Sequence, residues 1–230
     1  MKSSSLQIVK PETLRAQVEN NLRAAIVSGE LPPGSKLIER DLCEKMGVSR
    51  PSLREALRRL EAEKLIVNIP HKGPEVASLT LKDASELYAL RRLLESYAAH
   101  EFTRLATDKQ VDALGKTIEC LRLAAQKNSR SGVLDAKADL YAILLGGCGN
   151  ALVQEILGGL LARVSLLRAT SLMLPDRLPR SIEEIDDLLK HIRARDAKGA
   201  EKISYKHVQN AEKAALGVFQ HGPYSSALGK

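Results

Sequence analysis

The segment GVSRPSLREALRRLEAEKLI, residues 47–66, carries four arginines within ten positions, and the only acid among them is Glu55. An arginine side chain ends in a planar fork that can donate two parallel hydrogen bonds, either to O6 and N7 of guanine or to a phosphate group. Ser49 and Ser52 add two short hydroxyl donors near the beginning of the segment. These residue types suit contact with nucleic acid, although a solvated, charged helix face is the more ordinary role of arginines.

The arginines need a helix to hold them, and the sequence marks where that helix begins. Ser49 is a favourable N-cap, and Pro51 then falls in the first turn, where its missing N–H costs little. At helical spacing, Arg54 and Arg58 point away from the apolar face and toward solvent. That apolar face, which is expected to be core, consists of Leu53, Ala56, Leu57 and Leu60.

Two more helices and a hairpin are predicted around the arginine helix. The helices fall at residues 12–28 and 39–46, and the turn GVS joins the second of them to the arginine helix. After that helix, LIVNIP has the pattern of a strand, HKGP that of a tight turn with Lys72 and Gly73 at its tip, and EVASL that of a returning strand. Residues 10–78 are therefore predicted to form a winged helix-turn-helix, whose second helix fits the DNA major groove of about 12 Å.

The rest of the chain, residues 79–220, is predicted to be a second, all-helical domain. Apolar residues recur at helical spacing over six segments, and no segment alternates as a strand would. Leu90 and Ile156 are among the residues expected on the buried faces. The fold class is therefore mainly α, with predicted helices at residues 83–106, 108–128, 130–146, 150–170, 180–196 and 198–218.

Charged or titratable side chains interrupt the apolar stripes of this second domain. Burying a charge without a partner costs several kcal/mol, so the pattern predicts either internal ion pairs or a hydrated cavity that accepts an anion. Glu95, one helical turn after Arg91, is an available internal partner. Alternatively, some of these side chains reach the surface, or a helix is rotated from the predicted phase. The four inward residues are Arg91, Lys137, Arg163 and His207.

Composition limits the classes of protein to consider. The 230 residues carry a net charge of +7 with a pI of about 9.3, which allows a polyanionic partner without requiring one. Neither a signal peptide nor a membrane span of roughly 18 apolar residues is evident, so a cytoplasmic protein without membrane contact is expected. No catalytic triad spacing or phosphate loop indicates an enzyme, for which Tyr141, Cys148 and His207 would be the candidate nucleophiles or bases.

The N-terminal domain resembles the winged helix-turn-helix of GntR-family bacterial transcription regulators. The resemblance rests on IVSGELPPGSKLIERDLCEKMGVSRPSLREALRRLEAEKLIVNIPHKGPEVASL, with the motifs G-x-L-x-P-G-x-x-L-x-E, VSR-x-x-L-R-E-A-L-x-x-L and KG-x-x-V. It implies a homodimer that binds double-stranded operator DNA at a short palindrome. It also implies operator contacts at Arg40, Ser49, Arg50, Ser52, Arg54, His71, Lys72 and Gly73.

The second domain is similar to the all-helical effector domain (FCD domain) of the FadR subgroup, in its six-helix VanR-like form. The similarity lies in LYALRRLLESYAA, DLYAILLGGCGNALVQEIL and HIRARDAKGAEKISYKHV. Many such domains hold a metal through one aspartate and three histidines, and these positions correspond here to Lys137, Tyr141, Ile185 and His207. Only His207 is retained as a ligand. Because lysine at neutral pH and isoleucine are not ordinary ligands, no metal is expected there.

These observations lead to a functional hypothesis. The ammonium group of Lys137 would supply the positive charge that a metal offers to a small carboxylate. Tyr141 and His207 would donate hydrogen bonds to this ligand, and Arg91 would clamp it. Arg163 also belongs to the predicted effector site. The expected protein is a ligand-responsive transcription regulator, most often a repressor in such proteins, that needs no cofactor and is released from DNA by a small organic anion. A constitutive DNA-binding regulator with a vestigial pocket and, with less support, an enzyme are the alternatives.

Overall fold

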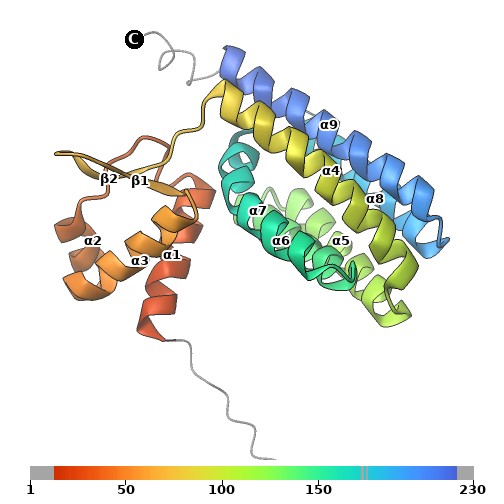
Figure 1. The fold of residues 1–230 in the computed structure, drawn as a ribbon, viewed down its shortest axis with the longest axis horizontal. Coiled ribbons are helices and arrows are strands. Elements are labelled where there is room, and N and C mark those ends of the chain that lie inside the picture. Colours follow the sequence, from red (N-terminus) through yellow and green to blue (C-terminus); the bar gives the residue numbers. More distant parts are fainter. Residues whose placement is uncertain (1–12, 172–173, 175, 222–230) are drawn as a thin grey trace, which may run out of the picture. The chain divides into compact units, whose positions relative to one another are not determined.

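Residues 13–171, 174 and 176–221 are described by the computed structural model, with side chains except at 168–171 and 218–221. The chain divides between Ala77 and Ser78 into an N-terminal unit of helices and one hairpin and a C-terminal unit of helices (Figure 1). Each unit buries apolar residues of its own. The predicted fold class, a winged helix-turn-helix followed by an all-helical bundle, is confirmed.

The N-terminal unit follows the predicted order of elements. It contains α1 (Leu14–Ser28), α2 (Glu39–Met46), α3 (Arg50–Ala62), β1 (Ile66–Ile69) and β2 (Gly73–Val76). The apolar face of α3 is buried, while Arg54 and Arg58 are exposed, as the helical spacing predicts. Arg59, on another side of α3, forms an ion pair with Glu19 of α1 at 3.6 Å. The core of the unit includes Val18, Leu22, Ile26, Leu37, Leu53, Ala56, Leu60, Leu65, Ile66 and Val76.

The hairpin begins its return strand earlier than predicted. β1 and β2 pair antiparallel, with Ile66 opposite Val76 and Ile69 opposite Gly73, so residues 70–72 form the loop. The return strand ends at Val76 and does not continue to residue 79. The reason is a contact that the local sequence does not reveal. The segment before α2 pairs with the beginning of β2, where the backbone N–H of Leu37 donates to the carbonyl of Pro74 at 2.8 Å.

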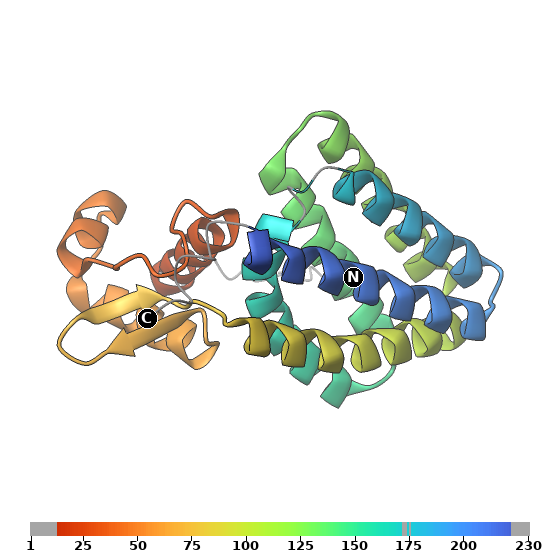
Figure 2. The ribbon, with the colours of Figure 1, turned by 90° about the horizontal axis from the view of Figure 1, so that it is seen from above.

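The C-terminal unit is a bundle whose longest described helices lie side by side. These two helices, α4 (Leu81–Leu105) and α9 (Ala197–His221), run next to each other in both views of the ribbon (Figure 2). Between them in sequence come α5 (Asp108–Gln126), α6 (Arg130–Gly147), α7 (Ala151–Ser171) and α8 (Arg177–Arg193). Capping boxes begin α4 at Thr80 and α5 at Thr107. Among the described helices, none is long and apolar enough to cross a membrane.

On α4 and α7 most residues of the predicted buried faces are buried or partly buried, Arg91 included, but two residues predicted there are exposed. On α4 the buried face runs through Arg91, Glu95 and Ala98. Since neighbouring residues in a helix are separated by about 100°, Leu90 is turned outward. Leu90 is 42% exposed and Ile156 on α7 is 49% exposed, so the predicted burial of both residues is wrong. The main core of this unit is formed instead by residues that include Phe102, Leu114, Leu121, Leu144, Leu157 and Ile192.

Candidate DNA-binding and effector sites

The beginning of α3 is organised by two serines. Ser49 is the N-cap, in an extended conformation with φ −74° and ψ 152°, and its hydroxyl accepts a hydrogen bond from the backbone N–H of Ser52 at 3.5 Å. The two serine hydroxyls lie 3.0 Å apart. Arg50 and Pro51 follow in the first turn and are exposed. The cap therefore fixes the helix start and leaves the side chain of Arg50 directed toward solvent.

Two further predicted contact residues lie on the exposed surface of α2 and α3. Arg54 donates from Nε to both carboxylate oxygens of Glu39, at 2.9 and 3.0 Å, and this hydrogen bond raises the pKa of Arg54 above its ordinary value. The Arg54 side chain nevertheless remains 61% exposed. Arg40 contacts only its neighbour Asp41 among the described residues, at 3.2 Å, and is 79% exposed. Both guanidinium groups are accessible to a ligand in solution.

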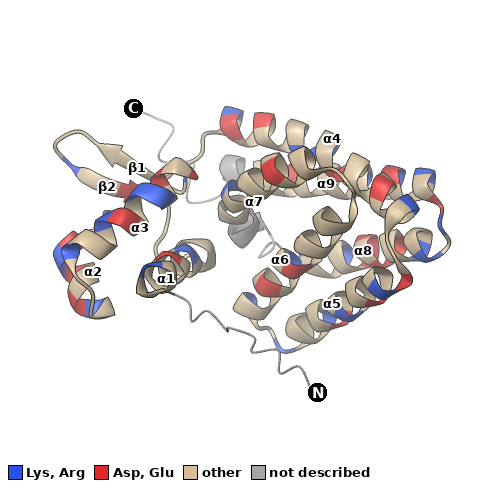
Figure 3. Cartoon of the chain, turned by 60° about the horizontal axis from the view of Figure 1, so that its bottom comes forward, with Lys and Arg blue, Asp and Glu red and all other residues tan. Residues whose placement is uncertain are grey.

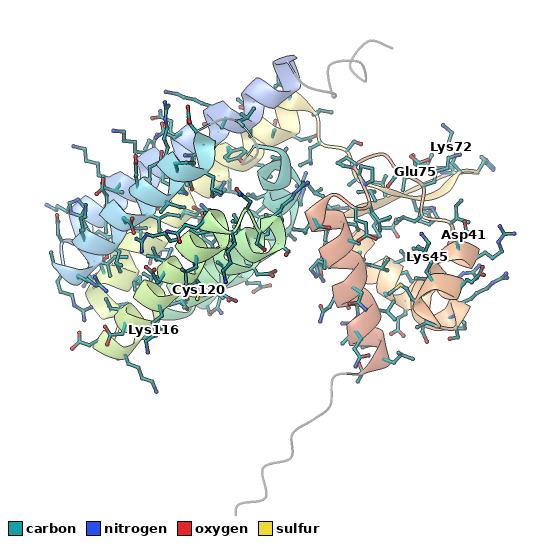
Figure 4. The ribbon with its side chains drawn as sticks, turned by 180° about the vertical axis from the view of Figure 1, so that it is seen from behind. Asp41, Lys45, Lys72, Glu75, Lys116 and Cys120 are labelled. Atoms are coloured by element: carbon teal, nitrogen blue, oxygen red, sulfur yellow. The ribbon has the colours of Figure 1, made fainter. Side chains whose placement is uncertain are left out.

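The loop of the hairpin presents the remaining predicted contacts. The backbone N–H of Lys72 donates to the carbonyl of Ile69 at 3.0 Å, which closes the loop. His71 and Gly73 have positive φ angles of 65° and 88°, and such angles are most easily adopted by glycine. His71 and Lys72 are exposed at the end of the hairpin, where Figure 4 shows Lys72. A tight loop of this kind holds a positive charge away from the body of the unit.

The structure places all eight predicted contact residues in the N-terminal unit, on α2, at the beginning of α3 and at the hairpin loop. Every one of them is exposed or partly exposed. Figure 3 shows basic residues on α2 and α3, interleaved with acidic residues. The surface is therefore mixed in charge, and the arrangement of individual side chains matters more than the net charge of the unit.

In the helical unit, Arg91 is buried against a carboxylate and two aromatic rings. Its Nε donates to Glu95, the partner that helical spacing indicates, and its Nη2 donates to the hydroxyl of Tyr141 at 2.8 Å. Its guanidinium carbon lies 5.2 Å from the ring centre of Tyr88 and 5.7 Å from that of Tyr141. Burial alone would lower the pKa of Arg91, but the charge of Glu95 offsets this and leaves the pKa raised.

Lys137 and His207 are buried close to this cluster. The ammonium group of Lys137 donates to the hydroxyl of Ser181 at 2.6 Å. His207 lies 2.5 Å from Glu184 through Nδ1. Burial lowers the pKa of His207 to about 4, and the charges of Lys137 and Arg91 act in the same direction, whereas the hydrogen bond with Glu184 opposes them. His207 is therefore neutral near pH 7 and donates from Nδ1 to a carboxylate.

Glu184 on α8 joins several donors, and the sequence analysis did not single it out. Besides His207, it accepts hydrogen bonds from Asn210 at 2.7 Å and from Arg177, the shortest at 3.1 Å. Burial raises the pKa of Glu184, but these donors, His207 foremost, lower it to about 2. Arg177, Ser181 and Glu184 recur at helical spacing on α8. This spacing is the signal in the sequence from which an inward polar stripe on α8 can be predicted.

Arg163, the remaining predicted effector residue, lies near the beginning of α4. It is partly buried, and its charge contributes to the lowered pKa of Asp83, after the hydrogen bonds from Thr80. Its Nε is buried and has no hydrogen-bond partner among the described residues. Asp83 precedes Arg91 by two helical turns on the same helix, so Arg163 is associated with a different part of the bundle from Lys137 and His207.

Two hollows open along α8 and α9 beside Glu184. One has a volume of about 380 Å³, and its lining includes Arg177 of α8 and Lys213 of α9. The other has a volume of about 300 Å³ and is lined by Lys206 and His207. Both are bordered by Arg180, Glu184 and Asn210. A small molecule could therefore approach His207 from the α8–α9 side of the bundle.

The residues at the family's metal positions do not fit a metal ion. The nitrogen of Lys137 is a hydrogen-bond donor to Ser181, and Ile185 presents a buried hydrocarbon side chain. His207 directs Nδ1 to Glu184, and the hydroxyl of Tyr141 accepts from Arg91. Among the described residues, no three His, Cys, Asp or Glu side chains are grouped as metal ligands would be.

A winged helix-turn-helix with exposed arginines, followed by a helical unit with buried charges, defines a two-domain regulatory protein. Residues 14–76 match the family of bacterial regulatory proteins named gntR, and residues 86–210 match the FCD domain. The chain belongs to the gntR family, in the group that carries an FCD domain. The resemblance inferred from the sequence motifs is thereby confirmed.

Named relatives are regulators of bacterial transcription. The HTH-type transcriptional regulator McbR of Escherichia coli (strain K12) is 25% identical over 193 residues, which cover 83% of this chain and 87% of McbR. The gluconate operon transcriptional repressor of Bacillus licheniformis is 30% identical over 128 residues, which cover 53% of this chain and 52% of the repressor. The match spans about half the length of this repressor, and the same holds for two relatives from Bacillus subtilis (strain 168), the HTH-type transcriptional regulator YdhC and the gluconate operon transcriptional repressor.

Solved structures with the same fold extend over nearly the whole chain. E. coli McbR/YncC has a TM-score of 0.79 at 24% identity and covers 90% of this chain and 99% of its own. A regulator of the GntR group from Rhodococcus sp. RHA1 has a TM-score of 0.76 at 21% identity and covers 88% and 97% respectively. At these identities the likeness concerns the fold.

Proposed function

We propose that the chain is a transcription regulator that binds double-stranded operator DNA through α3 and the hairpin loop. The observation that carries this proposal is the capped start of α3, which exposes Arg50 and Arg54 on a winged helix-turn-helix. Exposed arginines at this place match the dimensions and the acceptor pattern of the major groove. The protein acts as a homodimer on a palindromic site in the cytoplasm. Repression is the expected sign, as in the name of the gluconate operon relative.

The helical unit senses a small organic anion without a metal or other cofactor. Support comes from the buried side chains of Arg91, Lys137, Tyr141 and His207, which offer two permanent positive charges and two polar groups within one bundle. A carboxylate that replaced an internal acceptor would keep these donors satisfied. If the carboxylate binds more tightly to the state of the dimer that has low affinity for DNA, it shifts the population toward that state. Operator binding is then weakened.

A constitutive regulator with a vestigial effector site is the second candidate, and one observation favours it. Glu95 and Glu184 already provide carboxylates to Arg91 and His207, so the charges of the bundle are partly balanced from within. No effector would then be needed to stabilise the folded state. The two candidates differ in their response to added ligand, and not in their affinity for DNA.

Two linked measurements test the proposal. The first is selection of binding sites from random duplexes, followed by light scattering of the complex, and it should recover a palindrome bound by a dimer. The second is a thermal-shift screen of small organic acids in buffer with EDTA. Stabilisation without turnover supports the sensor, turnover indicates an enzyme, and the absence of any shift favours the vestigial site. If no duplex is selected, the proposed DNA-binding function is wrong.

A further inference from the structure

One acidic residue lies among the arginines of the candidate DNA-binding surface. Glu39, the first residue of α2, binds Nε of Arg54 on α3 with both carboxylate oxygens, at 2.9 and 3.0 Å. The two residues are 15 positions apart in sequence, so the ion pair joins the two helices of the helix-turn-helix. Since an acid near a DNA surface repels phosphate groups, its presence at this point calls for a physical reason.

The ion pair leaves the two Nη atoms of Arg54 without a hydrogen-bond partner among the described residues. Glu39 takes the Nε–H, and no described residue forms a hydrogen bond or an ion pair with either Nη atom of Arg54. The two Nη atoms are the prongs that donate to O6 and N7 of guanine. An arginine side chain is otherwise flexible, with a large loss of rotamer freedom when it is fixed. The ion pair with Glu39 therefore fixes the Arg54 side chain before DNA binds.

The surroundings of Arg54 show what Glu39 prevents. A hollow of about 280 Å³ is lined by both Glu39 and Arg54, and its other lining residues include Arg58, Glu61, Asn68 and Pro74. Glu61 is a second carboxylate at the edge of this hollow. Without Glu39, Glu61 would be the remaining carboxylate of this hollow, and its charge would draw the fork of Arg54 toward it and away from a base edge.

We infer that Glu39 is a positioning residue that sets the sequence specificity of DNA binding, at the expense of its general strength. This inference rests on the proposed DNA-binding function. The carboxylate aligns Arg54 for one base pair, and its charge opposes contact with DNA of any sequence. Loss of the carboxylate should thus weaken binding to the operator and strengthen binding to unrelated DNA.

The test uses the duplex that wild-type protein selects from random sequences and a scrambled duplex of the same length. Fluorescence anisotropy gives the dissociation constants of both for the full chain. In Glu39→Gln, the ratio of the two constants should fall by about tenfold, within the discrimination that a bidentate arginine contact provides. Affinity for the scrambled duplex should increase, which also shows that the variant is folded, and an unchanged or lower affinity would contradict the proposed effect of the charge.

Two variants separate positioning from a mere change of charge. Glu61→Gln removes an acid from the same hollow and should leave the ratio near that of wild type. In an Arg54→Ala background, Glu39→Gln should no longer change the ratio, because the side chain that it positions is absent. Glu39→Asp keeps the charge on a shorter side chain and should recover part of the specificity.

Three further outcomes would overturn the inference. The first is a specificity ratio in Glu39→Gln equal to that of wild type, and the second is higher affinity of that variant for the selected duplex. The third is an equal effect of Glu39→Gln with and without Arg54. Failure of the wild-type protein to select any duplex would instead refute the proposed DNA-binding function, so the two failures are distinguishable.

Discussion

Nδ1 of His207 on α9 lies 2.5 Å from Oε2 of Glu184 on α8, and the imidazole is the donor in this hydrogen bond. A carboxylate with a pKa of about 2 can only accept, and a histidine with a pKa of about 4 is neutral near pH 7. The pair therefore holds one proton on Nδ1 and one negative charge on Glu184. This arrangement leaves the other ring nitrogen of His207, Nε2, as the acceptor.

Stability should depend on pH through this histidine. In the unfolded chain His207 takes up a proton below a pH of about 6.5, whereas in the folded chain burial delays protonation to about 4. The contribution of His207 to the free energy of unfolding is thus complete above pH 6.5 and is lost as the pH falls to about 4. The free energy of unfolding should drop by up to about 3 kcal/mol from this residue. Urea denaturation of the helical unit at several pH values measures this loss.

The matched variants for this pH dependence are two histidine substitutions. His207→Asn should flatten the dependence between pH 4 and 6.5, the interval bounded by the two pKa values. His71→Asn removes an exposed histidine from the hairpin loop and should leave the dependence unchanged. A His207→Asn protein that loses as much stability as wild type on acidification would show that the buried imidazole is not responsible.

Arg54→Ala should remove part of the sequence specificity of DNA binding. A guanidinium fork that contacts a base contributes about 1–3 kcal/mol of discrimination, so affinity for the selected duplex should fall by that amount. Affinity for scrambled DNA should change much less. Competition anisotropy with both duplexes provides the measurement. Equal losses on both duplexes would mean that Arg54 contacts only the phosphate backbone.

Lys72→Ala should weaken binding to all sequences alike. The exposed ammonium group at the hairpin loop has no base-reading geometry, and a single phosphate contact accounts for about 0.9 of the slope of log affinity against log salt. The slope should therefore become shallower by about one unit. Lys116→Ala on α5 of the helical unit, labelled with Lys72 in Figure 4, is the control and should keep the wild-type slope. A shallower slope in the control would remove the evidence for a loop contact.

Two adjacent glycines on α6 should respond to alanine in opposite ways. A Cβ on Gly147 would lie 2.6 Å from two ring carbons of Phe102, so Gly147→Ala should destabilise the helical unit by about 1–3 kcal/mol. A Cβ on Gly146 would meet nothing within 4 Å, and Gly146→Ala should stabilise the helix by up to about 1 kcal/mol. Denaturation midpoints test both. A similar change in the two variants would contradict the packing of Gly147 on Phe102.

Helices could be predicted from the sequence because their signals are local. Ser49 and the leucine spacing that follows it mark α3 without reference to the rest of the chain. Helical phase was harder to predict on α4, where leucines occur on more than one side. The buried side is the one that carries Arg91 and Glu95, and besides this ion pair it receives Tyr141 of α6, whose hydroxyl accepts from the guanidinium group. That contact joins residues 50 positions apart, and periodicity within one helix does not reveal it.

The candidate effector residues were predictable only as separate inward charges. Arg91, Lys137 and His207 each interrupt an apolar stripe, and the structure buries all three. Their partners Ser181 and Glu184 were missed, because α8 carries many other charged residues, among which an inward serine and an inward acid do not stand out. The pairing of α8 with α6 and α9 is a tertiary property, so the geometry of the site had to come from the fold.

Release of DNA by an organic acid in the presence of EDTA tests most directly whether the helical unit senses an anion without a metal. Labelled selected duplex is bound to the full chain, and anisotropy is followed as small carboxylates are added. At least one acid should release the wild-type protein, and Lys137→Met should bind the duplex normally but require at least about tenfold more acid. Release that depends on added metal and is unaffected by Lys137→Met would contradict sensing without a metal.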